Sequence, residues 1–213
     1  MKVLVLGAGG KTGSAVVQQA VAAGHQVTAF VHHAGDYHGP AGVTIREGDA
    51  TDADAVADAV AAAVAGQDAV IDTIGGKTPY KSNITLEDDV AKAVIAAMQR
   101  HAVRRLLVTS SVGVGDSVAN ATAFLRILLK TFLRGATADK AAMERDVEAS
   151  ELDWTIARPA ILNDNPASGD VRVLDPATGN KAHKIARADL AAWLVAQLGS
   201  SEYVHRAVTV ATS

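Results

Sequence analysis

The sequence contains no cysteine, and this and several other absences narrow the classes of function open to it. Without thiols there is no disulfide framework, no thiolate nucleophile and no cysteine-ligated zinc site. The longest apolar stretch, residues 121–133, is interrupted by Arg126 and Lys130 and falls short of the ~20 residues that span a bilayer, so we expect no membrane segment. The sequence also has no Gly-x-Ser-x-Gly elbow and no His-Glu-x-x-His helix, which sets hydrolytic chemistry of those kinds aside.

Charge of one sign is not concentrated anywhere in the chain. The 20 Lys and Arg residues are scattered among 23 Asp and Glu residues, and the formal net charge is -3, so no nucleic-acid surface is indicated. The first residues run directly into a short apolar segment without the pattern of a signal peptide, and we expect a cytoplasmic protein. The oligomeric state is left open.

What the sequence does contain is hydrophobic residues, 49% of the 213, in a repeating order of short apolar runs and helical stripes. This order predicts one α/β domain over residues 1–213, a Rossmann-type doubly wound and mostly parallel sheet with helices on both faces. The runs predict strands at residues 2–6, 26–31, 43–46, 69–72, 104–109, 154–157 and 207–210. The stripes predict helices at residues 11–23, 51–66, 85–98, 119–133, 138–149 and 188–198.

Some features of this prediction are more specific. Thr85 and Asp88 have the spacing of a capping box, which predicts that Thr85 caps the helix it precedes. Residues 163–178 are rich in Asn, Asp, Pro and Gly and predict a loop around a short strand at 171–174. The predicted helix 119–133 is apolar on more than one face, so a pocket wall, a lid, a subunit contact or deeper burial must cover its second face.

A glycine-rich turn follows the first predicted strand and opens the first helix. Gly7, Gly10 and Gly13 have the spacing Gly-x-x-Gly-x-x-Gly, with Gly9 between them and Lys11 and Thr12 at the helix start. Glycines permit close backbone approach, and a helix N-terminus offers unpaired N–H groups and partial positive charge to a diphosphate. In this strand-to-helix position the pattern predicts a dinucleotide site. A Walker A loop is excluded, because Val5 stands where that motif requires glycine.

The segments LGAGGKTG, GDATD, LVTSSVG and LDWTIARPAIL carry a resemblance that spans nearly the whole chain. They resemble the atypical short-chain dehydrogenase/reductases, and most closely the small NAD(P)H-binding group that includes biliverdin-IXβ reductase/flavin reductase and the NmrA-like proteins. The resemblance implies that Asp49 and Ala50 border the adenine and that Thr73, Ile74, Gly75 and Gly76 lie on the ribose and phosphate side. It implies that Ser110, Pro159 and Ile161 lie at the nicotinamide end.

The end of the second strand bears on the choice of cofactor. Sites selective for NAD usually carry an acidic residue there, whereas this segment reads Phe30, Val31, His32, His33. Without that carboxylate a 2′-phosphate is not repelled, so NADP(H) is favoured over NAD(H), with His32 as its pH-dependent partner. A metal cluster of His32, His33 and His38 is disfavoured, because neighbouring residues of an extended chain face opposite sides; we expect no metal.

The Tyr-x-x-x-Lys dyad of typical short-chain dehydrogenases is missing, because Ala136 stands four residues before Lys140. Hydride transfer from NAD(P)H to a small conjugated acceptor, of the flavin- or quinone-reductase type, needs no such proton donor. Ser110 and Ser111 are candidate hydrogen-bond donors to the substrate, with strand-end capping or cofactor contact as the alternative. Lys140 either contacts a ribose or is a surface lysine paired with Asp139 and Glu144.

Two other functions stay open at this stage. One is a noncatalytic NmrA-like dinucleotide sensor, and the other is an NAD(P)-dependent epimerase, which is weaker because that chemistry usually needs the missing tyrosine. Arg158, at the end of the sixth strand, either meets a substrate anion or fixes the loop, and the structural role is favoured. The expected partner is a small-molecule substrate, held in a pocket formed by the C-terminal third of the chain.

Overall fold

The computed structural model describes residues 1–75 and 85–212. Its main sheet has the first strand of the chain in its interior, with later strands on both sides. Its eight strands lie in the order β3-β2-β1-β4-β5-β6-β10-β8, and every neighbouring pair is parallel except β8 and β10. The strands are β1 (Lys2–Leu6), β2 (Gln26–Val31), β3 (Thr44–Glu47), β4 (Ala69–Asp72), β5 (Arg105–Thr109), β6 (Asp153–Pro159), β8 (Val171–Leu174) and β10 (Arg206–Thr212). This is the doubly wound Rossmann order, and it confirms the predicted fold class.

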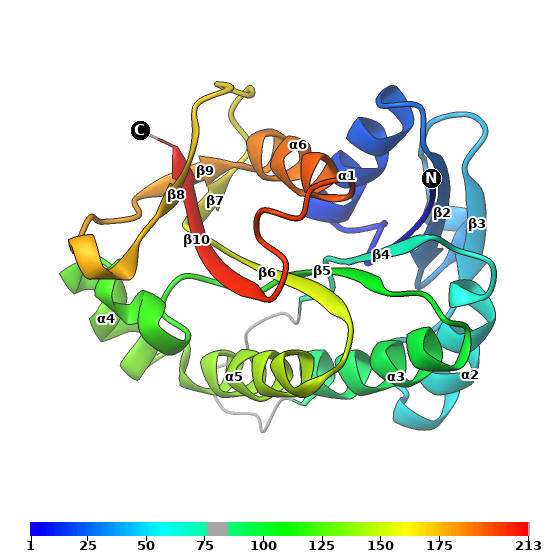
Figure 1. The fold of residues 1–213 in the computed structure, drawn as a ribbon, viewed down its shortest axis with the longest axis horizontal. Coiled ribbons are helices and arrows are strands. Elements are labelled where there is room, and N and C mark those ends of the chain that lie inside the picture. The colour runs from blue at the N-terminus through cyan, green and yellow to red at the C-terminus, as the bar shows by residue number, and fades with distance from the viewer. Residues whose placement is uncertain (76–84, 213) are drawn as a thin grey trace.

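Helices cover both faces of the sheet (Figure 1). On one face α1 (Lys11–Ala22) packs against α6 (Arg187–Gln197). On the other face α3 (Leu86–Arg100) packs against both α2 (Ala53–Val64) and α5 (Arg134–Ala149). Within the described ranges, 1–75 and 85–212, no helix has the length and apolar character that a membrane crossing requires.

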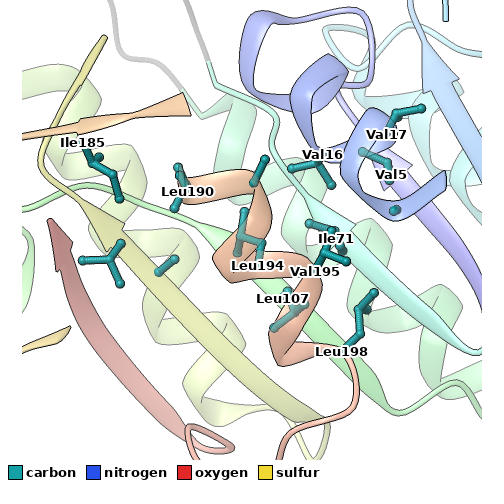
Figure 2. Close-up of a cluster of buried hydrophobic side chains, with 14 of the residues drawn as sticks. Val5, Val16, Val17, Ile71, Leu107, Ile185, Leu190, Leu194, Val195 and Leu198 are labelled. Atoms are coloured by element: carbon teal, nitrogen blue, oxygen red, sulfur yellow. The ribbon is translucent and has the colours of Figure 1, made fainter. Parts of the chain in front are cut away.

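The two faces of the sheet bury separate apolar clusters. Figure 2 shows the cluster under α6, which contains Leu190 and Leu194 of that helix together with Ile71 and Leu107 of the central strands. The opposite cluster contains the stripes expected from helical spacing, because the following side chains are all almost fully buried: Val56, Val60, Val64, Val90, Val94 and Met98. The carboxyl ends of the parallel strands therefore sit on a rigid base, which is where ligands bind in such sheets.

The predicted helix over residues 119–133 is wrong in its bounds. A 3-10 helix, η2 (Gly115–Ala119), precedes a shorter helix, α4 (Ala123–Lys130), and α5 begins at Arg134 rather than at residue 138. Thr122 is the reason for the break, because its hydroxyl accepts a hydrogen bond from Leu125 N (3.2 Å) and caps α4. The predicted strand at 171–174 is confirmed as β8, and β7 (Ile161–Asn163) pairs with β9 (Lys184–Ala186) in a small second sheet that the sequence did not indicate.

The predicted capping box at the start of α3 is also wrong. Thr85 makes no side-chain cap among the described residues. Instead, the carboxylate of Asp139, on α5, accepts hydrogen bonds from Glu87 N and Asp88 N, both at 3.1 Å. A carboxylate from a neighbouring helix thus supplies the acceptor that a local side chain was expected to supply.

Candidate functional site

The turn after β1 requires glycine because its backbone approaches itself closely. Gly7 has a φ of +73°, and its carbonyl oxygen accepts a hydrogen bond from Gly10 N (2.9 Å). A Cβ on Gly13 would lie 2.2 Å from the same oxygen, so no side chain fits at that position. The N-cap of α1 is Gly10, which has no side chain that could accept from the first N–H groups of the helix. The first turn of α1 also carries no acidic residue. Free N–H groups and the helix dipole therefore favour an anion here.

Residues 73–75, which follow β4, pack directly against this turn. Thr73 donates from both N and Oγ1 to Leu6 O, at 3.1 and 2.7 Å. A Cβ on Gly7 would lie 3.1 Å from Ile74 N, and one on Gly13 would lie 2.8 Å from Thr73 Oγ1. The structure thus brings residues 73–75 to the glycine turn, while Gly76, the fourth residue implied by the resemblance, lies outside the described residues.

Beside the turn, at the end of β2, lies an open pocket of about 330 Å³. Its lining residues are Gly7, Gly9, Gly10, Val31, His32, His33, Asp36 and Tyr37. The hydroxyl of Tyr37 is buried and has no hydrogen-bond partner among the described residues, which marks it as a donor open to a ligand. Asp36 and Tyr37 were not predicted as site residues from the sequence. Asp36 is the last residue of a short 3-10 helix, η1 (Ala34–Asp36), and Tyr37 follows it, and no sequence motif marks this turn.

The side chains of His32 and His33 were expected to face opposite sides of an extended chain, and this expectation is wrong. Their rings lie 4.0 Å apart between centroids, because the chain leaves the strand at His32 and bends. His32 Nδ1 lies 3.4 Å from Asp49 Oδ1. The pKa of Asp49 is held below its ordinary value, chiefly by the hydrogen bond from the hydroxyl of Thr51 (2.6 Å). In the described part of the chain no cluster of residues is suited to hold a metal ion.

The other residues predicted for the adenosine half lie on the same edge of the sheet. Ala50, beside Asp49 in the loop after β3, packs against the apolar cluster on the α2 and α3 face. Lys11 and Thr12 are the first two residues of α1, and Thr12 is half-buried. Lys11 Nζ donates to Asp164 Oδ2 at 2.6 Å, and Arg187 donates to the other carboxylate oxygen of Asp164 at 2.5 Å. This ion-pair bridge ties the glycine turn to the segment after β7, and no sequence signal pointed to it.

At the opposite half of the same edge, the ends of β5 and β6 bring Ser110 and Pro159 together. Ser110 N donates to Ala157 O (2.7 Å), while Ser110 Oγ is buried and has no partner among the described residues. Pro159 O accepts from Val112 N at 3.0 Å. Ser111 is half-buried beside Ser110, and Ile161 is 52% exposed at the start of β7. An unpaired buried hydroxyl at a strand end is the arrangement expected of a ligand contact.

Lys140 is not a surface lysine paired with Asp139 and Glu144. Its ammonium donates to Glu87 Oε2 at 2.5 Å, with the side chains of Lys140 and Glu87 only 16% and 5% exposed. Asp139 caps α3 instead. Next to this pair, burial raises the pKa of Asp72 to about 7.

Arg158 has the structural role that the sequence favoured. Its guanidinium donates to both carboxylate oxygens of Glu144 on α5, at distances from 2.7 to 3.2 Å, and to Asp116 in η2 at 2.5 Å. Arg158 and Glu144 are 4% and 3% exposed. The arginine therefore fixes the segment after Ser110 against α5 and is committed to protein carboxylates.

A glycine turn at the first crossover, an uncapped helix start and a pocket at the end of β2 together define a Rossmann-type dinucleotide-binding protein. Residues 7–201 match the model of the NAD(P)H-binding family, and the chain belongs to this family. This confirms the resemblance to NAD(P)H-binding proteins drawn from the sequence.

Solved structures similar to this chain agree with that assignment. The anaerobillin reductase ChuY from Escherichia coli O157:H7 is 26% identical, with a TM-score of 0.78 over 100% of this chain and 97% of that one. A Rossmann-fold NAD(P)-binding family protein from Shigella flexneri is 26% identical, with a TM-score of 0.73 over 99% and 93% of the two chains. A short-chain dehydrogenase/reductase from Veillonella parvula, in complex with NADP, shares the fold at 15% identity, with a TM-score of 0.78 over 99% and 94%.

Proposed function

We propose that the protein is an NAD(P)H-dependent oxidoreductase that transfers hydride to a small conjugated acceptor of the flavin or quinone class. The observation that carries the proposal is the buried hydroxyl of Ser110, which has no hydrogen-bond partner among residues 1–75 and 85–212 and lies at the strand end next to Pro159. Such a hydroxyl gains a hydrogen bond when a polar ligand arrives, and it stands on the same sheet edge as the glycine turn. The similarity to a reductase, ChuY, supports the same direction.

The bound nicotinamide supplies the hydride, and the residues of the chain supply binding and orientation. Gly7, Gly9, Gly10 and Gly13, with the N–H groups of Lys11 and Thr12, hold the diphosphate. Residues 73–75 face the ribose, with Asp49 and Ala50 at the adenine. Ser110 and Ser111 donate hydrogen bonds at the nicotinamide end, between Pro159 and Ile161. A conjugated acceptor spreads the transferred charge, so its protonation by solvent needs no tyrosine.

Lys140 takes a positioning role in this scheme rather than a catalytic one. Its ammonium is committed to Glu87, and the pair lies beneath residues 73–75 rather than in the open pocket. The residue thereby helps to hold the ribose-side segment in place. This reading replaces the direct ribose contact that was one of the two alternatives from the sequence.

NADP(H) is the preferred cofactor in this proposal, with NAD(H) as the weaker ligand. Both imidazoles of His32 and His33 line the pocket at the end of β2, where the 2′-phosphate is expected. Asp36 lines the same pocket, and its negative charge opposes a phosphate. The preference therefore requires that hydrogen bonds from the two imidazoles outweigh the repulsion between Asp36 and the phosphate.

The substrate side is assigned to the C-terminal third of one domain spanning residues 1–213. The chain after Pro159 runs through β7 to Asp164, where the bridge to Lys11 and Arg187 anchors it. Ile161 presents an exposed apolar side chain next to Pro159, which suits the flat face of a conjugated ring. The acceptor then lies between this segment and Ser110.

The test is NADPH consumption in the presence of a panel of flavins and quinones, followed at the absorbance of the reduced nicotinamide. We expect saturable oxidation with at least one acceptor. Binding of the cofactor without oxidation above background for any acceptor would contradict the proposal. The matched variant is Ser110→Ala, which is expected to bind NADPH and to turn over slowly.

A noncatalytic sensor is the second candidate, because α4 leaves large apolar side chains exposed. Phe124 and Ile127 are 73% and 65% exposed. A patch of this kind suits a protein partner whose affinity changes with the state of the dinucleotide. The sensor predicts tight binding of the cofactor and no turnover with any acceptor in the panel.

A further inference from the structure

Three ionisable side chains from three elements lie near one another beside residues 73–75: Glu87 pairs with Lys140, and the charges of both act on Asp72. We refer to Asp72, Glu87 and Lys140 as the buried charge cluster. Asp72 is the last residue of β4, Glu87 lies in the first turn of α3, and Lys140 lies on α5. Asp72 and Glu87 are each 5% exposed. The side chain of Lys140 is 16% exposed, and its ammonium is paired with Glu87 at 2.5 Å.

Among the described residues, the ammonium of Lys140 lies near the carboxyl groups of Asp72 and Glu87. A third nearby carboxylate, Asp139, accepts hydrogen bonds from two N–H groups of α3. Asp88, one residue further on, pairs outward with Lys92 at 2.6 Å. The strands on either side of β4 present only apolar residues at this level, Leu6 on β1 and Val108 on β5. A buried carboxyl beside a second carboxylate holds a proton more tightly than a carboxyl in water.

Burial is the chief reason why Asp72 keeps this proton. It raises the pKa of Asp72 to about 7; the charge of Glu87 raises it further, while the Ile74 N–H and Lys140 act in the opposite direction. At neutral pH the carboxyl is therefore poised between its two states. A modest change of charge or hydration nearby then shifts its occupancy.

The cluster is joined to the cofactor site through residues 73–75. Asp72 Oδ1 accepts a hydrogen bond from Ile74 N (2.9 Å). A Cβ on Gly75 would lie 3.9 Å from Glu87 Oε1, so this segment rests directly on the cluster. Its other side packs against Gly7 and Gly13. A ligand charge at the glycine turn is therefore separated from the cluster by one tightly packed peptide segment, which screens it weakly.

We propose that the buried charge cluster is a proton-binding site linked to dinucleotide binding. The diphosphate adds negative charge and excludes water, and both effects disfavour the ionised carboxyl, so the protein takes up a proton from solvent as the ligand binds. The proton goes to the carboxyl of Asp72, and no other bond is made or broken. The inference rests on the proposed cofactor site and adds a proton-binding group that lies outside the pocket at the end of β2.

Calorimetric titration of NADPH in buffers of different ionisation enthalpy counts the protons exchanged on binding. At pH 7 we expect the wild type to take up roughly 0.4 of a proton at this site, the change for a group near half occupancy whose pKa rises by one unit or more. Asp72→Asn removes this uptake. Asp153→Asn is the matched control. Asp153 is the first residue of β6, at the amino ends of the parallel strands and away from the cluster, and it pairs with Arg104.

Two further variants distinguish a linked proton site from a merely structural one, and they keep the test open if Asp72→Asn fails to fold. Glu87→Gln removes a repulsive charge and moves the pH of maximal uptake down. Lys140→Met removes the cation and moves it up. Equal proton counts for the wild type and Asp72→Asn, or no movement in Glu87→Gln and Lys140→Met, would overturn the inference while leaving the cofactor site standing. No binding of NADPH to the folded wild type would overturn the site and the inference together.

Discussion

Gly13 faces the carbonyl oxygen of Gly7 so closely that a Cβ on Gly13 would come within 2.2 Å of it. The first turn of α1 and the end of β1 are therefore in direct backbone contact, and the first N–H groups of α1, which have no acceptor within the helix, face the open side of the turn. This contact fixes the geometry on which the proposed cofactor site depends.

Gly13→Ala is expected to weaken dinucleotide binding by about tenfold or more, because the backbone must move to admit the methyl group. The dissociation constant is measured by calorimetry and the fold is checked by circular dichroism. Gly199→Ala is the control, since a Cβ there meets nothing within 4 Å. Unchanged affinity in a folded Gly13→Ala protein would show that the turn does not hold the diphosphate.

Ser110→Ala separates ligand binding from stability. The hydroxyl has no partner in the described structure, so its removal is expected to leave the melting temperature unchanged or slightly raised while turnover falls about tenfold or more. Ser117→Ala is the contrasting variant. Its buried hydroxyl accepts from Gly113 N and donates to Val114 O, so its loss costs about 1–3 kcal/mol of unfolding free energy. A Ser110→Ala protein as active as the wild type would remove the serine from the mechanism.

The preference for NADPH over NADH is expected to rise in His32→Arg, because a guanidinium is permanently charged and can bind a 2′-phosphate with two parallel hydrogen bonds, beside Asp36 in the same pocket. The ratio of the two dissociation constants, measured for the wild type and the variant, is the readout. An unchanged ratio in a folded His32→Arg protein would refute the role given to His32.

The stability of the protein without ligand is expected to fall with rising pH because of Asp72. Its pKa is 3.8 ordinarily and about 7 in the folded protein, so the folded state binds more protons than the unfolded state between these values. The stabilisation is complete below pH 4 and is lost as pH rises through 7, by up to about 3 kcal/mol between pH 5 and pH 8. Urea unfolding at both pH values measures it. Asp72→Asn should show a flatter profile, and an identical profile would contradict the assignment.

Arg158→Met is expected to destabilise the fold by about 3–5 kcal/mol, because it leaves the carboxylate of Glu144 buried and unpaired. The double variant Arg158→Met with Glu144→Gln should recover part of this loss. The unfolding free energies of Arg158→Met, Glu144→Gln and the double variant give the coupling energy between the two residues. Additive effects would show that the buried pair does not act as a unit.

Most of the fold was predictable because its signals are local. Short β-branched runs gave the strands, and the spacing of Val90, Val94 and Met98 gave the buried face of α3. The division of residues 119–133 was missed because the apolar pattern continues across Thr122, whose capping hydrogen bond ends one element and begins the next.

The candidate site was predictable only where its residues are neighbours in sequence. The glycine turn is one such segment, but Lys140 pairs with a residue 53 positions away, and Asp72 lies in an ordinary apolar strand until the packing of α3 and α5 buries its carboxyl. The bridge from Lys11 to Asp164 spans 153 positions. No spacing rule reaches across such separations, because the contacts are made by the tertiary fold.

The most direct test of the central claim is calorimetric titration of the wild-type protein with NADPH, NADP, NADH and NAD. We predict saturable binding at one site per chain, with NADPH bound more tightly than NADH and NADP more tightly than NAD. A folded protein that binds none of the four would contradict the claim that the turn at Gly7, Gly10 and Gly13 holds a dinucleotide.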